Sequence, residues 1–159
     1  MEIDLKRIVA FMQKNAFCFA TSEDGMPRVR PFCTAMEHDN KLYIIMSKTM
    51  HPDQKDIRPV WSQIIQNPNI AICSWDSSKK WLRISGTIKE DASIELKRKM
   101  IADNRIMDDF TTNDVDEFQR IFLVDNIKIE LRGNCADCCA SGGFCTHNNC
   151  KLQNKFFVD

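Results

Sequence analysis

The stretch FATSEDGMPRVRPF, residues 19–32, decides the fold. Asp24-Gly25 at its centre is a strong signal for the tight turn of a β-hairpin, and segments typical of strands lie on both sides of it. In the second segment Arg28 and Arg30 are two residues apart, so their side chains point to the same face of a strand. Two such arginines repel each other unless an anion or acidic groups lie between them. The hairpin is therefore also the first candidate for an anion-binding site.

Apolar residues at helical spacing predict helices outside this hairpin. One covers about residues 4–14, and a short one lies in VWSQIIQ before the turn NPN. A third begins with a capping pattern in DASIELKRKMIAD. All three lie between segments of strand-like sequence, so we expect them at the periphery of a sheet.

Strand-forming residues with turn signals between them predict the other elements. The first three strands are expected to form an antiparallel meander. Strands joined mostly by hairpins cannot form a doubly wound parallel sheet, which needs a crossover helix at nearly every step. The sequence thus predicts a small antiparallel barrel decorated by helices. The expected strands cover residues 16–22, 27–37, 41–47, 70–76, 81–90, 118–124 and 127–132.

Composition narrows the class of protein. The 159 residues indicate one domain, and 22 basic residues balance 22 acidic ones, whereas a nucleic-acid-binding protein usually carries a basic excess. No apolar run approaches the length that spans a bilayer. The N-terminus MEIDLKRIVAFMQKN has acidic residues within its apolar pattern, unlike a secretory signal. We expect a cytoplasmic protein without nucleic-acid or membrane partners.

The eight cysteines fall into two groups. In a reducing compartment they indicate thiols or metal ligands rather than disulfides. Cys18, Cys33 and Cys73 lie in apolar stretches, and we expect them to be buried as small apolar side chains. The other five belong to a polar, cysteine-rich C-terminal extension of residues 133–159, which we separate from the domain of residues 1–132.

The extension contains GNCADCCASGGFCTHNNC, with the spacing C-x2-C-C-x5-C-x4-C. Two thiolates in a C-x2-C pair can chelate one tetrahedral ion, and a further pair would complete a four-sulfur site. Structural zinc, an iron–sulfur centre and no metal at all remain open as interpretations. The candidate ligands are Cys135, Cys138, Cys145 and Cys150, with Cys139 as a substitute.

Four segments in register, FATSEDGMPRVRPF, LYIIMSK, NPNIAICSW and WLRISGTI, resemble the pyridoxamine 5′-phosphate oxidase-like family of FMN-binding split β-barrels, in particular its short, stress-protein-like members. The resemblance covers about residues 3–131. It implies a mainly β (α+β) antiparallel split barrel with peripheral helices and bound FMN. It also implies a homodimer with FMN at the interface, since so small a barrel leaves the flavin exposed. The apolar segments IIM and WLRI are the expected interface surface.

The resemblance also assigns site residues. It gives Arg28 to the FMN phosphate, and the residues that follow on that strand to the edge of the ring. The end of the strand at Ser47 and a later lysine, in a segment that looks longer than usual, belong to the phosphate and ribityl side, and WLRISG forms the opposite wall. The residues expected to contact FMN are Arg28, Val29, Arg30, Pro31, Met46, Ser47, Lys48, Lys55, Trp81 and Leu82.

FMN carries its own redox chemistry, so we assign no catalytic residue. Oxidases that act on vitamin B6 phosphates are longer and carry a basic pocket and an R-L-x-P type C-terminus, and neither is present here. We therefore expect an FMN-dependent oxidoreductase that acts on an unidentified small molecule. The alternative is a non-catalytic module that binds flavin or haem for storage or sensing.

Overall fold

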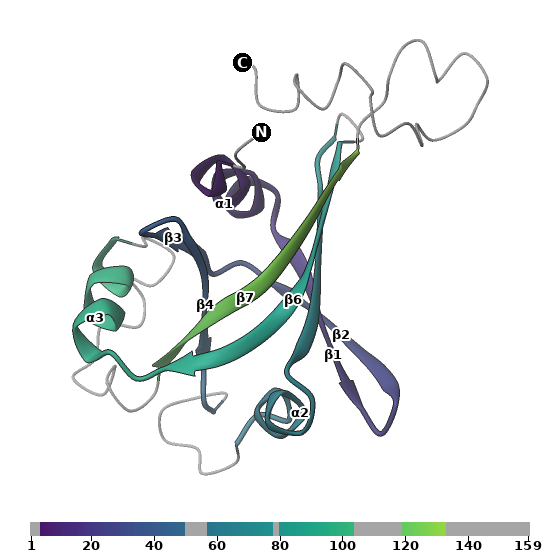
Figure 1. Cartoon of the computed structure of the whole chain (residues 1–159), viewed down its shortest axis with the longest axis vertical. Helices are drawn as coiled ribbons and strands as arrows, with labels where there is room; N and C mark the ends of the chain where they lie inside the picture. Colours follow the sequence, from purple (N-terminus) through teal and green to yellow (C-terminus); the bar gives the residue numbers. More distant parts are fainter. Residues whose placement is uncertain (1–3, 50–56, 78–79, 104–118, 133–159) are drawn as a thin grey trace.

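Seven strands form one antiparallel sheet in the order β2-β1-β5-β6-β7-β4-β3, with three helices around it (Figure 1). This computed structural model describes residues 4–49, 57–77, 80–103 and 119–132. The predicted mainly β, antiparallel barrel with peripheral helices is confirmed. The elements are α1 (Leu5–Asn15), β1 (Phe17–Glu23), β2 (Met26–Phe32), β3 (Ala35–His38), β4 (Lys41–Ser47), α2 (Val60–Gln66), β5 (Asn69–Trp75), β6 (Trp81–Asp91), α3 (Ile94–Asp103) and β7 (Gln119–Arg132).

The predicted β1–β2 hairpin is present, and its turn has the expected chemistry. Asp24 and Gly25 both have positive φ, 51° and 77°, as a type I′ turn requires. Thr21 is the register partner of Arg28, and Phe19 that of Arg30. Because directly opposite residues project to the same face, both arginines lie on the face of the sheet that carries Thr21 and Phe19.

The expected meander of the first three strands is wrong. The segment expected as one strand over residues 27–37 is two strands, β2 and β3, which lie at opposite edges of the sheet. Pro31 gives the physical reason, because a residue without an N–H belongs on an edge strand and stops further pairing there. The chain then crosses to the other edge, where the Thr34 carbonyl accepts from the Ile45 N–H at 3.1 Å.

The two segments expected at the end of the domain are a single strand, β7. Its pairing with β6 shifts register between Ser85 and Thr87, opposite a residue with positive φ, Asn126. Gly86 is required at this bulge, since a Cβ there would lie 2.5 Å from the carbonyl oxygen of Asp125. The ladder between β6 and β7 is therefore interrupted by a bulge at this glycine.

Side-chain caps begin two of the predicted helices. The Asp4 carboxylate accepts from the N–H groups of Lys6 and Arg7 at the start of α1. The Ser93 hydroxyl accepts from Leu96 at the start of α3. None of the described helices is long and apolar enough to cross a membrane.

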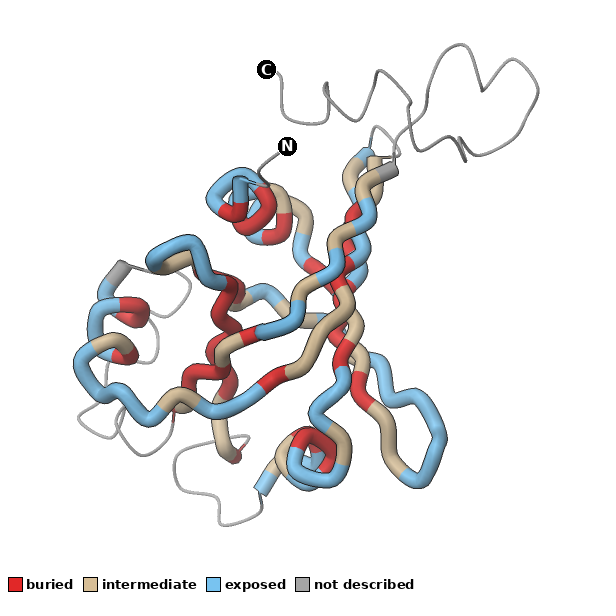
Figure 2. The backbone as a smooth tube through the Cα atoms, viewed as in Figure 1, coloured by how far each residue is buried: buried red, intermediate tan, exposed pale blue. Residues whose placement is uncertain are grey.

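The core consists of two apolar clusters, one on each face of the sheet (Figure 2). The larger cluster lies inside the curve of the sheet with α1 and α2, and the smaller one lies under α3. Strand β4 serves both, with Ile44 in the first and Ile45 in the second. Ile44, Ile45 and Met46 are therefore fully buried, so the expectation that IIM provides interface surface is wrong. Leu82 is buried in the same way.

Candidate functional site

A polar cluster lies where α2 packs against the β1–β2 hairpin. We call it the Arg30 cluster, and it consists of Thr21, Arg30 and Gln63. Nη2 of Arg30 donates to Oγ1 of Thr21 at 3.0 Å and to Oε1 of Gln63 at 2.5 Å, and the Thr21 hydroxyl also donates to Gln63 at 2.6 Å. Thr21 and Gln63 are buried, with 4% and 3% of their surface exposed. Their hydrogen bonds fix the guanidinium between the hairpin and α2.

The charge of Arg30 is only partly compensated. Its Nη1 atom is buried and has no hydrogen-bond partner among the described residues. Burial, and then the positive charge of Arg58, lower the pKa of Arg30, while Glu23 acts in the opposite direction. An unmatched, desolvated donor on a cation costs free energy, and an anionic oxygen is the acceptor that would match it.

Arg58 connects this cluster to the end of β4. Its N–H donates to the carbonyl of Lys48 at 2.9 Å. On the neighbouring helix, Nε1 of Trp61 donates to the Ser47 carbonyl at 3.4 Å. The structure therefore places Arg30, Ser47 and Lys48, three of the residues that the sequence predicts for the site, around the N-terminal end of α2.

Two other predicted residues contribute less at this place. Arg28 shares the strand face of Arg30, as predicted, but its side chain is exposed and forms an ion pair with Glu23 at 3.0 Å. The side chain of Met46 is packed in the core, so Met46 can offer only main-chain atoms. Lys55 lies outside the described residues, as do the tail cysteines.

Val29 presents main-chain groups at the free edge of β2. In an antiparallel pair, successive residues turn their N–H and C=O groups alternately toward and away from the partner strand. A proline belongs at a position where the missing N–H would point away from the partner strand. Pro27 and Pro31 are four residues apart on β2, so both have this orientation. Val29 has the same alternation, so its N–H and C=O point outward between two residues that cannot donate.

The outer face of β2, β1, β5 and β6 is uncovered in the described chain. We call it the open face. Its residues alternate with the core residues, and small side chains occupy its centre while tryptophans lie at one end. Val29 is 64% exposed and Trp75 is 74% exposed. The open face consists of Cys18, Ala20, Val29, Pro31, Ala71, Cys73, Trp75, Trp81, Arg83 and Ser85.

The expectation that Cys18, Cys33 and Cys73 are buried is wrong, because all three are exposed. Cys18 lies between two buried phenylalanines and Cys73 follows buried Ile72. The alternation of a strand turns Cys18 and Cys73 to the side away from the core, and Cys33 lies beyond the end of β2. The apolar residues that suggested burial are the neighbours of these cysteines, and it is the neighbours that face the core.

The two predicted residues of β6 are separated from the Arg30 cluster. Trp81 pairs with Trp75 across the strands and has the Arg83 guanidinium 5.3 Å from its ring centre. Its side chain is on the open face, whereas Arg30 is on the core face. Leu82 is fully buried and can offer only main-chain atoms. One chain therefore does not bring the Trp81 ring to the Arg30 cluster.

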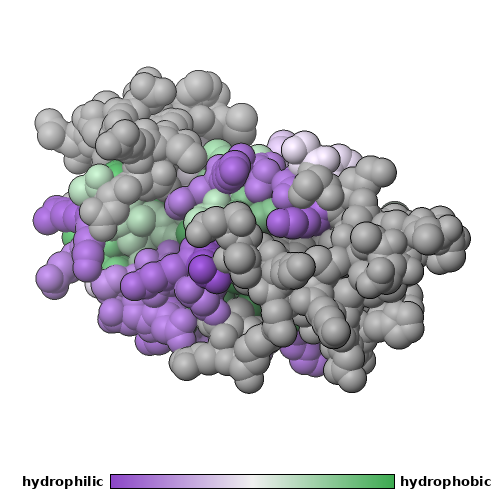
Figure 3. Space-filling model, turned by 90° about the horizontal axis from the view of Figure 1, so that it is seen from above, coloured by the Kyte–Doolittle hydropathy of each residue, from purple (hydrophilic) through white to green (hydrophobic). Residues whose placement is uncertain are grey.

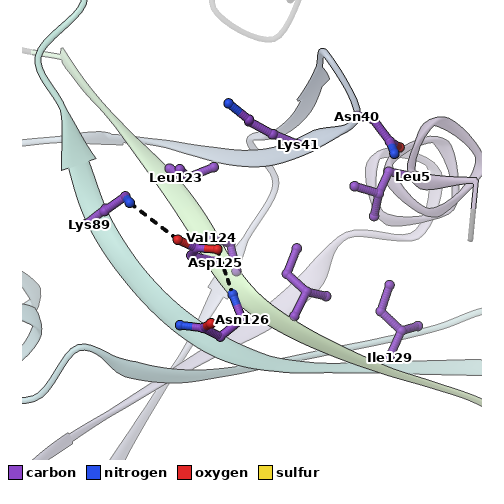
Figure 4. A pocket seen from close by; sticks show the side chains of 10 residues that line it. Leu5, Asn40, Lys41, Lys89, Leu123, Val124, Asp125, Asn126 and Ile129 are labelled. Carbon is purple, nitrogen blue, oxygen red and sulfur yellow. Dashed lines mark hydrogen bonds and ion pairs between the residues drawn. The ribbon is translucent and has the colours of Figure 1, made fainter.

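A separate pocket of about 600 Å³ lies between α1, the β3–β4 turn and the bulge of β7 (Figure 4). Lys89 and Asp125 form an ion pair at 3.3 Å at its wall. The Asn126 N–H, and then Lys89, lower the pKa of Asp125. Figure 3, viewed from above, shows apolar surface between hydrophilic side chains. Because Lys89 pairs with Asp125, and Lys41, the other cation of the lining, is exposed to solvent, the pocket offers less to an anion than Arg30 does.

Sequence reasoning missed Arg58, Thr21 and Gln63. Gln63 had a usable signal, since it lies between Val60 and Ile64 on the apolar stripe of its helix, and a polar residue in such a position needs a buried partner. Arg58 and Thr21 had none, because their roles depend on how α2 docks against the hairpin.

A family model described as pyridoxamine 5′-phosphate oxidase matches residues 5–125. No curated protein sequence matches the chain.

Among solved structures, a NimC/NimA family protein from Clostridium acetobutylicum is 26% identical, with a TM-score of 0.67 over 79% of this chain and 82% of that one. A pyridoxamine 5′-phosphate oxidase-related, FMN-binding protein from Nostoc punctiforme is 16% identical, with a TM-score of 0.54 over 81% and 79%. HutZ, a heme storage protein from Vibrio cholerae, is 14% identical, with a TM-score of 0.55 over 82% and 95%. The last two are similar in fold.

Proposed function

Because the chain belongs to the pyridoxamine 5′-phosphate oxidase family, whose model matches residues 5–125, we propose that this protein binds FMN and uses it to oxidise or reduce a small molecule. The single observation that carries the proposal is the half-buried Arg30 guanidinium, whose buried Nη1 atom is unmatched and which lies beside a second cation, Arg58. The phosphate of FMN is a dianion with several acceptor oxygens, which suits such a pair.

The phosphate end of FMN would lie at the N-terminal end of α2. Arg30 and Arg58 supply charge there, and the Ser47 hydroxyl and the Lys48 ammonium extend the donor set along the end of β4. The Ser47 hydroxyl is already positioned, because it accepts from Nε2 of Gln119 at 3.2 Å. Arg28, and Lys55 from outside the described residues, complete the set of cations that the resemblance assigns.

The ring would lie along the free edge of β2. The pyrimidine edge of a flavin carries both N–H and C=O groups, and Val29 offers one C=O and one N–H in the complementary direction. Pro27 and Pro31 have no N–H groups, so Val29 is the one outward-facing donor between them. The edge can therefore bind a short, flat ligand but cannot pair with a long strand.

The site is completed by a second copy of the chain. The Trp81 ring and the Arg30 cluster lie on opposite faces of the sheet within one chain, so a flavin site that includes both needs two chains. The open face supplies the surface, with exposed Val29 and Trp75 at its ends and small residues at its centre. We therefore propose a homodimer with FMN at the interface, and with Trp81 of one chain near the flavin of the other.

Bound FMN supplies the redox chemistry itself, so the residues of this chain bind, orient and shield it. The Arg30 cluster holds the phosphate, Val29 orients the ring, and the second chain excludes water. A true pyridoxamine-phosphate oxidase activity is not part of the proposal. We place the protein in the cytoplasm, with no nucleic-acid or membrane partner.

A non-catalytic haem-binding or flavin-binding module is the second candidate, because HutZ shares the fold. Haem needs an axial ligand, usually histidine. Within the described ranges the histidine is His38, on β3 at the opposite edge of the sheet from β2. The charge around Arg30 suits a phosphate dianion better, so FMN is favoured.

The visible absorption spectrum of the purified protein tests the proposal. We expect a yellow protein with one FMN per chain, released on denaturation and identified by chromatography. A colourless protein that takes up no added FMN, or a haem spectrum, would contradict it. Turnover of a nicotinamide cofactor with quinone or nitro acceptors then separates an oxidoreductase from a storage or sensing module.

A further inference from the structure

A carboxylate lies beside the two arginines of the β1–β2 hairpin. Glu23 is two residues from Thr21 on β1, so its side chain lies on the face that carries Arg28 and Arg30. Oε2 of Glu23 accepts from Nε of Arg28 at 3.0 Å, and 31% of the Glu23 side chain is exposed. Burial and Arg58 lower the pKa of Arg30, and the charge of Glu23 opposes them. Glu23 therefore interacts with both arginines of β2.

The register shows in which direction Glu23 draws Arg28. Arg28 is the register partner of Thr21. Arg30 lies two residues from Arg28 in the direction away from the turn, and Glu23 is the next residue of this face toward the turn. Glu23 and Arg30 are thus on opposite sides of Arg28 along the hairpin. The ion pair holds the Arg28 guanidinium toward the turn and away from the Arg30 cluster.

We propose that Glu23 is a built-in competitor of phosphate, which holds Arg28 away from the Arg30 cluster and thereby lowers the affinity of the site for FMN. The inference rests on the proposed function, because it takes the FMN phosphate to bind at Arg30. A carboxylate and a phosphate are both anionic acceptors for a guanidinium. Arg28 can therefore turn toward the phosphate only by weakening its pair with Glu23.

Glu23 has opposite effects on the empty and the filled site. Arg58 lowers the pKa of Arg30, as expected for two cations that repel each other. A carboxylate beside the arginines reduces the repulsion between cations while no phosphate is bound. The same carboxylate repels the phosphate once it binds. Glu23 therefore stabilises the empty site and weakens the hold on the cofactor.

The test compares FMN binding by the unchanged protein and by Glu23→Gln, which removes the charge and keeps the shape. Fluorescence titration of the flavin-free whole chain should give a Kd about three- to tenfold lower for Glu23→Gln. In an Arg28→Ala background the same substitution should have a smaller effect, because the guanidinium that it releases is absent.

Asp24→Asn is the matched control. It also removes one acidic charge from the hairpin, at an exposed position of the turn. Asparagine suits the positive φ of this position, so the turn should be preserved. The Kd for FMN should not change. Riboflavin is the control ligand, since it has the ring and the ribityl chain of FMN without the phosphate, and Glu23→Gln should not alter its affinity.

Three results would overturn the inference and leave the proposed function in place. They are equal or weaker FMN binding by Glu23→Gln, an equal effect of Glu23→Gln with and without Arg28, and the same gain from Asp24→Asn. A tighter riboflavin complex of Glu23→Gln would place the effect on the ring and would also contradict it. If the unchanged protein binds no FMN, the proposed function fails and this inference fails with it.

Discussion

Arg30 and Gln63 are joined by a hydrogen bond of 2.5 Å that ties the edge strand β2 to helix α2. The bond occupies one guanidinium nitrogen and leaves Nη1 unmatched among the described residues. Gln63 is almost completely buried, so the contact holds the guanidinium in one place. The edge strand β2 and helix α2 are in this way held together at the Arg30 cluster.

Replacing Arg30 should weaken FMN binding more than replacing Arg28. A charge-assisted contact to phosphate contributes about 1.5–3 kcal/mol, so Arg30→Ala should raise the Kd for FMN about 10- to 150-fold. Arg28→Ala should have a smaller effect, because that side chain is exposed and already paired with Glu23. Fluorescence titration with FMN measures both variants. A larger loss from Arg28→Ala would support the assignment that the family resemblance makes.

Converting Gln63 to glutamate should lower the affinity for FMN without lowering thermal stability. In Gln63→Glu a carboxylate faces Arg30 and competes with the phosphate for its charge, so FMN affinity should fall at least tenfold. Thermal stability should hold, because the new carboxylate pairs with the half-buried Arg30 guanidinium instead of standing alone. Titration and thermal unfolding are measured on the same sample. Unchanged affinity would show that the phosphate binds away from Arg30.

The bulge between β6 and β7 should not accept a side chain at position 86. Gly86→Ala places a Cβ against the Asp125 carbonyl, which belongs to the backbone and cannot rotate away. We expect a loss of about 1–3 kcal/mol in the free energy of unfolding. Urea denaturation measures it, with Ser85→Ala as the control on the same strand. Equal stability of the two variants would mean that the bulge can relax.

The homodimer should depend on the open face. Trp75→Glu puts a charge on its exposed tryptophan and should shift the protein toward monomer in light scattering at micromolar concentration. The control is Ile65→Glu, since Ile65 is 79% exposed on α2 and lies outside the open face. Dissociation caused by Ile65→Glu and not by Trp75→Glu would place the interface on α2.

Removal of residues 134–159 should leave the flavin domain folded and able to bind FMN. The last strand of the sheet, β7, ends at Arg132, so the described core is complete before the tail begins. Retained FMN and a cooperative unfolding transition would support the boundary at residue 132, and loss of either would make the tail part of the site.

Elemental analysis of the intact protein decides the chemistry of the tail. One zinc per chain would support a structural site formed by the tail cysteines. Iron with sulfide would make the tail a redox partner of the flavin. Absence of metal from protein purified under reducing conditions would contradict both.

Local sequence signals predicted the hairpin well, because Asp24-Gly25 determines the turn and strand alternation then places both arginines on one face. They predicted the order of helices and strands apart from the division of residues 27–37 into two strands and the single strand β7. They did not predict the sheet order, since pairing between β1 and β5 is a long-range contact. The same alternation predicts an exposed Cys18, because the next residue, Phe19, faces the core. The roles of Gln63 and Arg58 could not be reached, because they depend on the docking of α2.

The prolines of β2 affect how copies of the protein can meet. An unprotected edge strand recruits further strands from other molecules and supports strand-by-strand polymerisation. Pro27 and Pro31 lack the N–H donors on either side of Val29. A further strand therefore cannot form consecutive backbone hydrogen bonds along this edge. A protein with an exposed apolar face can then associate face to face into a closed pair, while its edge remains resistant to fibre formation.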